Sequence, residues 1–148
     1  MDVITNRFNY EQAVGNINWN SHTFKWILCS GTYNPTTFAD MNTYSQVSAF
    51  ELTTGKGYEQ GGLIVPTSAY RNDVDDTVVY WSGNPSWVTS GGSIGPFRYA
   101  VQYDTSFDNA LVYFYDFEKD QLANDGAVIT INMSTDGQMV ATKVCKNF

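Results

Sequence analysis

Two neighbouring stretches decide the fold: FRYAVQY at residues 97–103 and ALVYFYDF at residues 110–117. In the first, every second side chain from Phe97 to Tyr103 is aromatic or branched, which is the two-residue period of a β-strand. The second is the most hydrophobic strand candidate of the chain. It is therefore predicted to be a central strand.

Shorter strand candidates lie on both sides of these two. Residues 77–81 are rich in β-branched and aromatic side chains, and residues 126–134 and 138–144 are predicted to pair as a hairpin around Asp136-Gly137. Seven or eight short strands with one helix candidate predict an all-β protein, an antiparallel β-sandwich or jelly-roll-like fold. The remaining candidates are residues 24–29, 50–52 and 58–70, the last a bent or edge strand containing Pro66.

The helix candidate lies near the N-terminus, at residues 5–15. Thr5 or Asn6 is predicted to cap it and Gly15 to end it. Residues 1–148 are predicted to form a single β-sandwich domain, with 1–20 as an N-terminal helix and arm. Residues 30–48 form a long polar stretch, which we expect to be an interaction loop because such loops in compact domains are usually functional or ordered by a partner.

The composition indicates a folded chain and excludes two kinds of partner. Hydrophobic residues make up 43% and charged residues only 16%, unlike a disordered chain. Eight Lys and Arg against fifteen Asp and Glu give a net charge of −7, and the basic residues are scattered singly, so neither nucleic acid nor an anionic membrane surface is an expected partner. No apolar run approaches the ~18–20 residues that span a bilayer. Residues 1–7 show no signal-peptide pattern.

One catalytic motif matches, GGSIG at residues 91–95, which fits the nucleophile elbow of α/β-hydrolases. That motif acts on a strand-to-helix turn of a large α/β sheet, with a histidine after the serine. Here Pro96 follows at once, and the single histidine, His22, lies upstream. A glycine-rich loop is therefore predicted, with His22 as a solvated turn residue.

The acidic residues and the cysteines indicate no metal or cofactor site. Residues 116–120 alternate like the start of a calcium loop, but Gln121 and Ala127 stand where that loop needs Gly and Glu. The acidic pairs at 75–76 and at 104 and 108 are expected to be surface charge at turns. Two cysteines and one histidine do not make a zinc site. Cys29 and Cys145 are predicted to be free thiols, with a bridge from the first strand to the last as the alternative.

Several short segments occur in a characteristic order and spacing: EQAVGNINWN (11–20), TFKWIL (23–28), YNP (33–35) with Asp40, FEL (50–52), GKGY (55–58), YAVQYDT (99–105), LVYFYDF (111–117) and the hairpin around STDG (134–137). Each segment is weak alone, but together they cover nearly the whole chain. Their order and spacing resemble a family of small structural proteins of tailed bacteriophages, similar to capsid cement or decoration proteins.

The resemblance implies a non-enzymatic virion protein that decorates the outer surface of the major capsid protein lattice and stabilises the head. It implies synthesis in the bacterial host cytoplasm and a final location on the capsid exterior, where we expect a homo-oligomer, a dimer or trimer. Aromatic side chains in amide-rich loops would supply the contacts, because Tyr and Trp are favoured interface anchors. The expected interface residues are Tyr33, Phe38, Tyr44, Trp87 and Phe107, unless each packs on its own core instead.

Two other functions remain open at this point. A tail or baseplate component of the same virion would share the fold and the lack of catalytic motifs. A carbohydrate-binding module would use aromatic stacking on sugars, for which the chain offers ten tyrosines and four tryptophans (Trp19, Trp26, Trp81 and Trp87).

Overall fold

A computed structural model describes residues 2–33, 37–133 and 138–143 of the chain. It is an all-β fold of antiparallel sheets with one short N-terminal α-helix, as the alternating pattern predicted. The elements are β1 (Asp2–Ile4), α1 (Asn6–Ala13), β2 (Phe24–Cys29), the 3₁₀ helices η1 (Tyr44–Gln46) and η2 (Ser48–Phe50), β3 (Leu63–Val65), β4 (Thr67–Asn72), β5 (Thr77–Ser82), β6 (Ser86–Val88), β7 (Ile94–Asp104), β8 (Ala110–Ala123), β9 (Val128–Thr130) and β10 (Gln138–Lys143).

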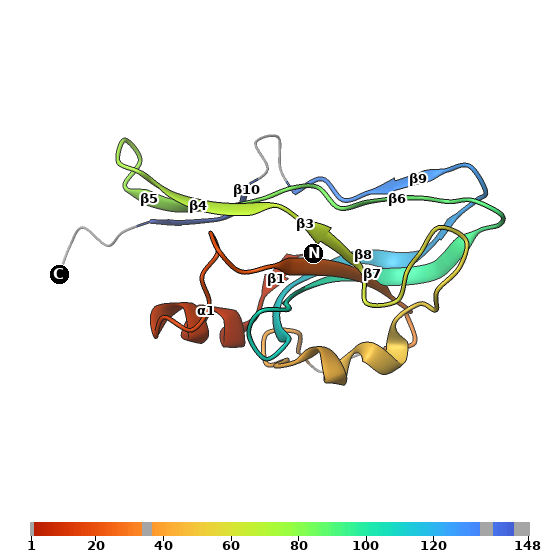
Figure 1. The fold of residues 1–148 in the computed structure, drawn as a ribbon, viewed down its shortest axis with the longest axis horizontal. Coiled ribbons are helices and arrows are strands. Elements are labelled where there is room, and N and C mark those ends of the chain that lie inside the picture. The colour runs from red at the N-terminus through yellow and green to blue at the C-terminus, as the bar shows by residue number, and fades with distance from the viewer. Residues whose placement is uncertain (1, 34–36, 134–137, 144–148) are drawn as a thin grey trace.

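The larger sheet has five strands in the order β1-β8-β7-β2-β3 (Figure 1). Its centre is the pair β7 and β8, with Val101 opposite Phe114 and Gln102 opposite Tyr113. These strands contain the two stretches that decided the fold, so the prediction that residues 110–117 are central is confirmed. β1, which the sequence did not predict, closes the far edge by pairing with β8.

The second layer of the sandwich is built on one long two-stranded ribbon. β5 pairs with β10 at one end and β6 with β9 at the other. A hydrogen bond from the Ile131 N–H to the Pro85 carbonyl (3.0 Å) continues the pairing between them. β4 adds a third strand beside β5 only, because at Pro66 the chain passes from β3 in the five-stranded sheet into β4. The β4–β5 hairpin projects beyond the end of the five-stranded sheet (Figure 1).

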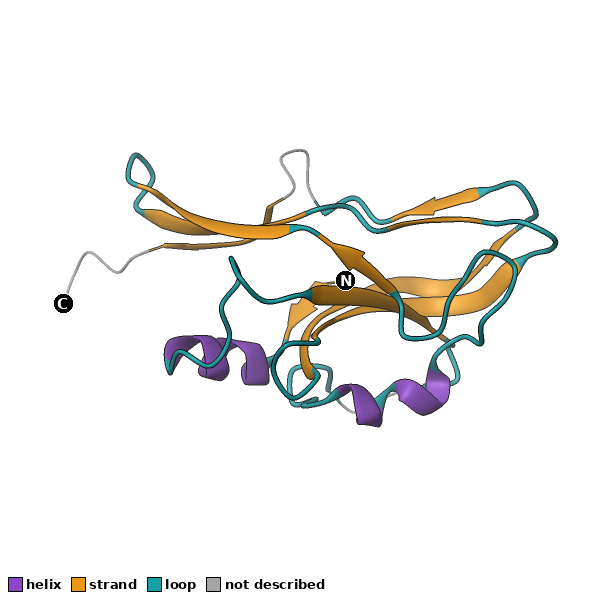
Figure 2. Ribbon diagram, viewed as in Figure 1, coloured by secondary structure: helices purple, strands orange, loops and turns teal. Residues whose placement is uncertain are grey.

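The five-stranded sheet is covered on both faces. Between the two layers lies a core that includes Trp26 and Leu28 of β2. On the other face Val101, Phe114 and their neighbours pack against the segment that carries η1 and η2. Figure 2 shows the 3₁₀ helices η1 and η2 on this side of the sheet, whereas Phe8 of α1 packs in the core between the two layers, against Trp19 and Tyr80. The sheet is therefore the middle layer of three.

One buried row of this core contains an unpaired amide. Trp26, Gln102 and Tyr113 lie directly opposite one another on β2, β7 and β8, and the Trp26 and Tyr113 rings meet edge to face with centroids 5.6 Å apart. Gln102 is fully buried. Within the described part of the chain, neither its amide nitrogen and oxygen nor the Trp26 indole nitrogen has a hydrogen-bond partner. Such groups carry an uncompensated desolvation cost.

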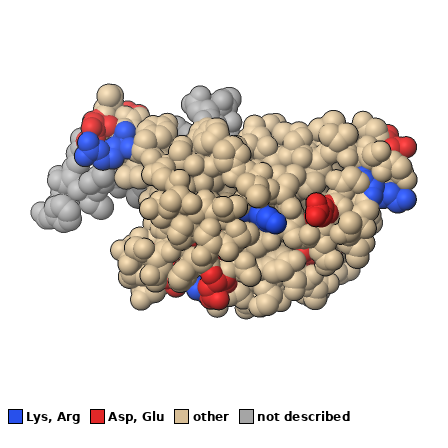
Figure 3. Space-filling model, in the orientation of Figure 1, with Lys and Arg blue, Asp and Glu red and all other residues tan. Residues whose placement is uncertain are grey.

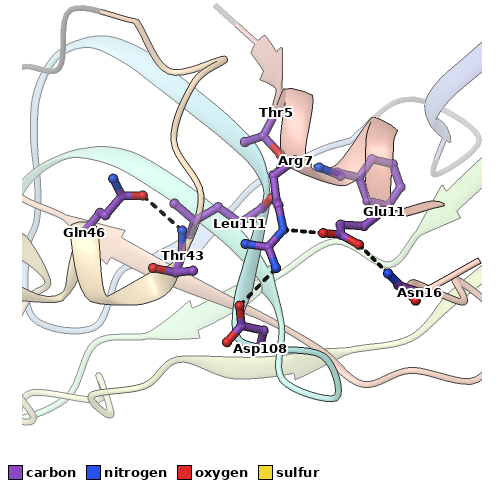
Figure 4. A network of polar contacts seen from close by, with 9 residues as sticks. Thr5, Arg7, Glu11, Asn16, Thr43, Gln46, Asp108 and Leu111 are labelled. Atoms are coloured by element: carbon purple, nitrogen blue, oxygen red, sulfur yellow. Dashed lines mark hydrogen bonds and ion pairs between the residues drawn. The ribbon is translucent and has the colours of Figure 1, made fainter. Parts of the chain in front are cut away.

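Helix α1 begins and ends as predicted and is anchored to the sheet. The Thr5 side chain accepts a hydrogen bond from the Phe8 N–H (3.0 Å) and donates one to the Leu111 carbonyl of β8 (2.5 Å). Arg7 pairs with Glu11 (2.9 Å) and with Asp108 (3.0 Å) beyond β7, as Figure 4 shows. The described part of the arm, residues 2–20, is therefore an integral part of the domain.

The turn after α1 also protects an open strand edge. The Asn20 side chain accepts from the Ala69 N–H (2.7 Å) and donates to the Ala69 carbonyl (3.4 Å) at the outer edge of β4. A strand edge with unpaired backbone groups is a template for pairing with another chain. Asn20 closes this edge at its middle.

Two local predictions are wrong, and one is right in part. Residues 48–50 form η2, and Glu51 makes a single bridge to Cys29, because the segment turns to cover the sheet. The stretch 58–70 bends at Pro66 and supplies edge strands, as predicted, but it divides there between two sheets, as β3 and β4. The last two strands do not form a hairpin with each other: β9 pairs with β6 and β10 with β5, since the ribbon is held by non-local partners. Asp136-Gly137 itself lies outside the described residues.

Candidate interaction surface

Three of the five expected interface residues lie in the segment below the five-stranded sheet. Tyr33 is buried, and its ring lies 4.5 Å from that of Phe50. Phe38 is half-buried and packs on Phe114 of β8 at 4.7 Å. Tyr44 stacks on Tyr103 of β7 at 4.8 Å, with 20° between the ring planes. These side chains cover the sheet of their own domain.

The other two also pack inside the domain. Trp87 is buried in β6 and faces the sandwich core, with its ring 6.2 Å from that of Tyr58. Phe107 is half-buried against the same core, and the guanidinium carbon of Arg7 lies 5.6 Å from its ring centre. All five residues thus contact the core of their own domain. They were interface candidates because they were expected to be exposed in loops, and in the structure they are buried or half-buried instead. The described part of residues 30–48 is a cover for β7 and β8.

The covering segment encloses a buried carboxylate, Glu51. Its side chain accepts hydrogen bonds from the hydroxyls of Tyr44 and Tyr58 (2.7 Å for Tyr58) and from the Gly61 N–H (2.6 Å). Burial, together with the neighbouring Glu51 carboxylate, raises the pKa of Tyr103 to about 12 and that of both Tyr44 and Tyr58 further still. The cluster is satisfied by donors of its own domain and fastens the segment that covers the sheet.

Cys29, next to this cluster, is a free and buried thiol. Burial and the nearby Glu51 raise the pKa of its thiol far above the usual value. The predicted free state is confirmed for Cys29, whereas Cys145 lies outside the described residues. A thiol of this kind is inert while the domain is folded.

The expectation that His22 and Asp104 are both solvated is wrong, because the two side chains bond to each other. Asp104 is fully buried, and its carboxylate accepts hydrogen bonds from the His22 Nδ1 (2.6 Å) and the Ser106 N–H (2.8 Å). The arrangement orients an imidazole, as in a catalytic triad. Among the described residues, however, no hydroxyl or thiol side chain hydrogen-bonds to His22. The pair ties the turn before β2 to the end of β7.

Of the acidic residues at 116–120, Asp116 has a structural role. Asp116 is buried in β8 and accepts two hydrogen bonds from the Arg98 guanidinium, at 3.0 and 3.3 Å. Burial alone would raise the pKa of this carboxyl, but the bonds from Arg98 outweigh it and hold the pKa below the usual value. No group of three His, Cys, Asp or Glu side chains that could hold a metal occurs in the described residues.

Exposed apolar side chains occur on several strands of the sandwich. Ile64 of β3 is 63% exposed, and Val88 of β6 and Val128 of β9, which lie directly opposite each other, are 60% and 59% exposed. A groove of about 520 Å³ lies between β3 and β6, lined by Ile64, Val88 and other residues of both strands. We call Ile64, Val88 and Val128 the apolar strip. The sequence signal for it was the alternation around Trp87, which places Val88 on the outer face.

The tip of the β4–β5 hairpin is a second exposed region. Val74 is 91% exposed, and Arg71 and Asp73 form an exposed ion pair at 3.7 Å. Figure 3 shows charged side chains at both ends and at the lower margin of the face in view, and a blue and a red group near its middle. The groove lined by Ile64 and Val88 is the candidate interaction surface.

Comparisons with known proteins give no match: no protein-family model, no curated protein and no solved structure matches this chain. Within the described ranges, no helix combines the length and the apolar character needed to cross a membrane.

Proposed function

We propose that this chain is a non-enzymatic structural protein of a bacteriophage virion, a decoration protein that binds the outer surface of the major capsid protein lattice and stabilises the head. The observation that carries the proposal is the apolar strip with its groove. A large exposed apolar patch marks an interaction site on a folded domain, and Ile64 and Val88 both line this groove. The buried aromatic residues make the domain a rigid support for such a contact.

The all-β sandwich and the charge fit the same role. A cement protein has to hold its contact surface in a fixed geometry, and a three-layer arrangement with a doubly covered middle sheet does so. The net charge of −7 favours docking onto a more basic shell surface. On the particle we expect a dimer or trimer, since symmetric oligomers match the symmetry of a shell.

Emptied capsids of the phage, mixed with the purified protein, test the proposal. The wild-type protein is expected to co-sediment with the capsids and to raise their disruption temperature. Ile64→Asp, in the apolar strip, should weaken binding, whereas Val74→Asp, at the hairpin tip, is the matched control and should bind like wild type. Absence of binding at micromolar protein would refute the decoration role.

Two alternatives have separate outcomes in the same system. Gold-labelled antibody on the tail or baseplate instead of the head would assign the chain to those structures. A carbohydrate-binding role is weakened because Trp19, Trp26 and Trp87 are buried in the sandwich core and cannot stack on a sugar. Trp81 is half-buried, and a positive glycan array would be needed to restore this alternative.

A further inference from the structure

A pocket of about 200 Å³ lies between two loops at the end of the molecule away from the β4–β5 hairpin (Figure 1). The loop after η2 lines it with residues 52–56 and with Tyr58, and the stretch from the end of the β6–β7 loop into β7 lines it with residues 93–95. The glycine-rich motif at 91–95, to which the proposed function gives no role, therefore forms part of one wall of a pocket.

The backbone of Lys56 is fixed in a conformation that lysine seldom adopts. Gly55 and Tyr58 close a tight turn with two reciprocal backbone hydrogen bonds (2.8 and 3.0 Å), and Lys56 within this turn has a φ of 60°. Few residues other than glycine have a positive φ, and among those Asn, Asp and His are enriched. Strained positions of this kind cluster at functional sites. The Lys56 carbonyl also accepts from the Ser90 N–H (2.9 Å), so the turn is fastened to the glycine-rich loop.

The side chain of Lys56 is held in place as well. It crosses Gly92 so closely that a Cβ at that position would lie 2.9 Å from the Lys56 Cδ, and its Nζ donates to the Gly91 carbonyl (3.0 Å). No ion pair within the described ranges includes Lys56. An ammonium has three N–H donors, so Lys56 offers two of them, and its charge, to a ligand.

The other polar side chains of the lining also have donors to offer. The Thr54 Oγ1 already accepts from the Gln60 N–H (3.0 Å), which leaves its O–H free to donate. The hydroxyls of Thr53 and Ser93 are exposed and have no hydrogen-bond partner in the part of the chain that the structure describes. This surplus of donors favours a ligand that is rich in acceptor oxygens.

The charge of the lining favours the same kind of ligand. Lys56 is the one charged residue among the described residues that line the pocket. Glu51 and Asp125 are attached to this region but do not line the pocket: Glu51 accepts from the Tyr58 hydroxyl (2.7 Å) and Asp125 from the Gly91 N–H (3.1 Å). The pocket is therefore a locally cationic place in a chain whose net charge is −7.

We propose that this pocket binds an oxyanion, the carboxylate or phosphate group of a small ligand. The Lys56 Nζ supplies the charge, and the hydroxyls of Thr54 and Ser93 donate hydrogen bonds to the oxygens. The Tyr58 ring and Ile94, which line the same pocket, contact the uncharged part of the ligand. The pocket is smaller than the ~300–1,000 Å³ of sites for drug-sized molecules, so the ligand is small.

Inorganic phosphate and acetate are the probes, titrated separately into the ¹⁵N-labelled protein in Tris-chloride buffer at constant ionic strength and followed by NMR. Glucose is the uncharged control. Saturable shifts of the amides of residues 53–57 and 91–95 are expected with an anion at millimolar concentrations and not with glucose. Binding of phosphate alone would assign the site to phosphate-bearing ligands, and binding of acetate alone to carboxylates.

Two lysine variants separate the pocket from the general charge of the protein. Lys56→Gln should weaken binding about tenfold or more, as for the loss of a charge-assisted hydrogen bond. Lys119→Gln removes the same charge from an exposed position on β8 outside the pocket, and should bind within about twofold of wild type. Ser93→Ala, which leaves every charge in place, should weaken binding about threefold to tenfold and serves as the second variant if Lys56→Gln does not fold.

Every other outcome overturns the proposal. No saturable shift with either anion, shifts that map outside the two loops, tighter binding of glucose than of both anions, or equal losses from Lys56→Gln and Lys119→Gln would exclude an oxyanion site between these loops. Because the titrations use no capsids, their result does not depend on whether the decoration role holds.

Discussion

Replacement of the buried Gln102 by methionine is expected to stabilise the protein. The two side chains are similar in size, but Gln102 is fully buried, and its amide nitrogen and oxygen have no partner within the described part of the chain. Removing a buried unsatisfied amide recovers about 1–3 kcal/mol of desolvation cost. The free energy of unfolding should rise by that amount.

The expected gain is large enough to measure by heat and by denaturant. A domain of this length unfolds with an entropy of about 0.3 kcal/mol/K, so Gln102→Met should raise Tm by about 3–10 °C. Urea unfolding followed by tryptophan fluorescence should show a higher midpoint at an unchanged slope. Gln60→Met, at an exposed position, is the control and should change stability by less than about 0.5 kcal/mol.

A destabilised Gln102→Met variant would refute this reasoning. Loss of about 1 kcal/mol or more would mean that the amide makes compensating interactions in the folded protein. In that case Trp26, whose indole nitrogen is also unpaired and which lies opposite Gln102, is the first residue to examine.

Three further outcomes are expected. Burial raises the pKa of Tyr103 to about 12, so the folded state keeps a proton that the unfolded chain loses near pH 10; the free energy of unfolding should fall between about pH 10 and 12, and urea midpoints that do not change over this range would contradict it. In a Cys145→Ser background, Cys29 should react with a thiol reagent only after denaturation, and labelling of the native protein would show that the cover over the sheet opens. Thr5→Ala should lower the free energy of unfolding by about 1–2 kcal/mol, because both the helix cap and the bond to the Leu111 carbonyl are lost; Thr5→Ser, which keeps the hydroxyl, should recover most of it in chemical denaturation.

The sequence predicted the fold where the signal is local. The two-residue alternation at residues 97–103 and the apolar run at 110–117 define β7 and β8, and Thr5 and Gly15 delimit α1. These features depend on neighbouring residues alone. The partners of β9 and β10 cannot be predicted in this way, because β9 pairs with β6 and β10 with β5, which lie about forty to sixty residues earlier in the chain.

The candidate site was predicted less well, and the reason lies in β7 and β8. Val101 and Phe114 are apolar on the face opposite to Gln102 and Tyr113, so these strands need cover on both sides. The described part of the polar segment 30–48 covers one face of these strands, and its aromatic side chains make the contacts with the sheet. An aromatic side chain in a loop sequence gives no information about which surface the loop lies on. Ile64 and Val88 can be recognised as the lining of one groove only from the folded structure, because they lie on strands of different layers.

The pairing of β1 with β8 has a consequence for how the chain acquires its structure during synthesis. Ile4 lies opposite Tyr113, and Asp2 opposite Tyr115, so β1 has no partner until more than a hundred further residues have been made. β2 waits for β7 in the same way, whereas the β4–β5 hairpin joins adjacent segments and is ready early. Because sheets of such distant pairings close slowly, most of this domain has to assemble after translation of the strands is almost complete.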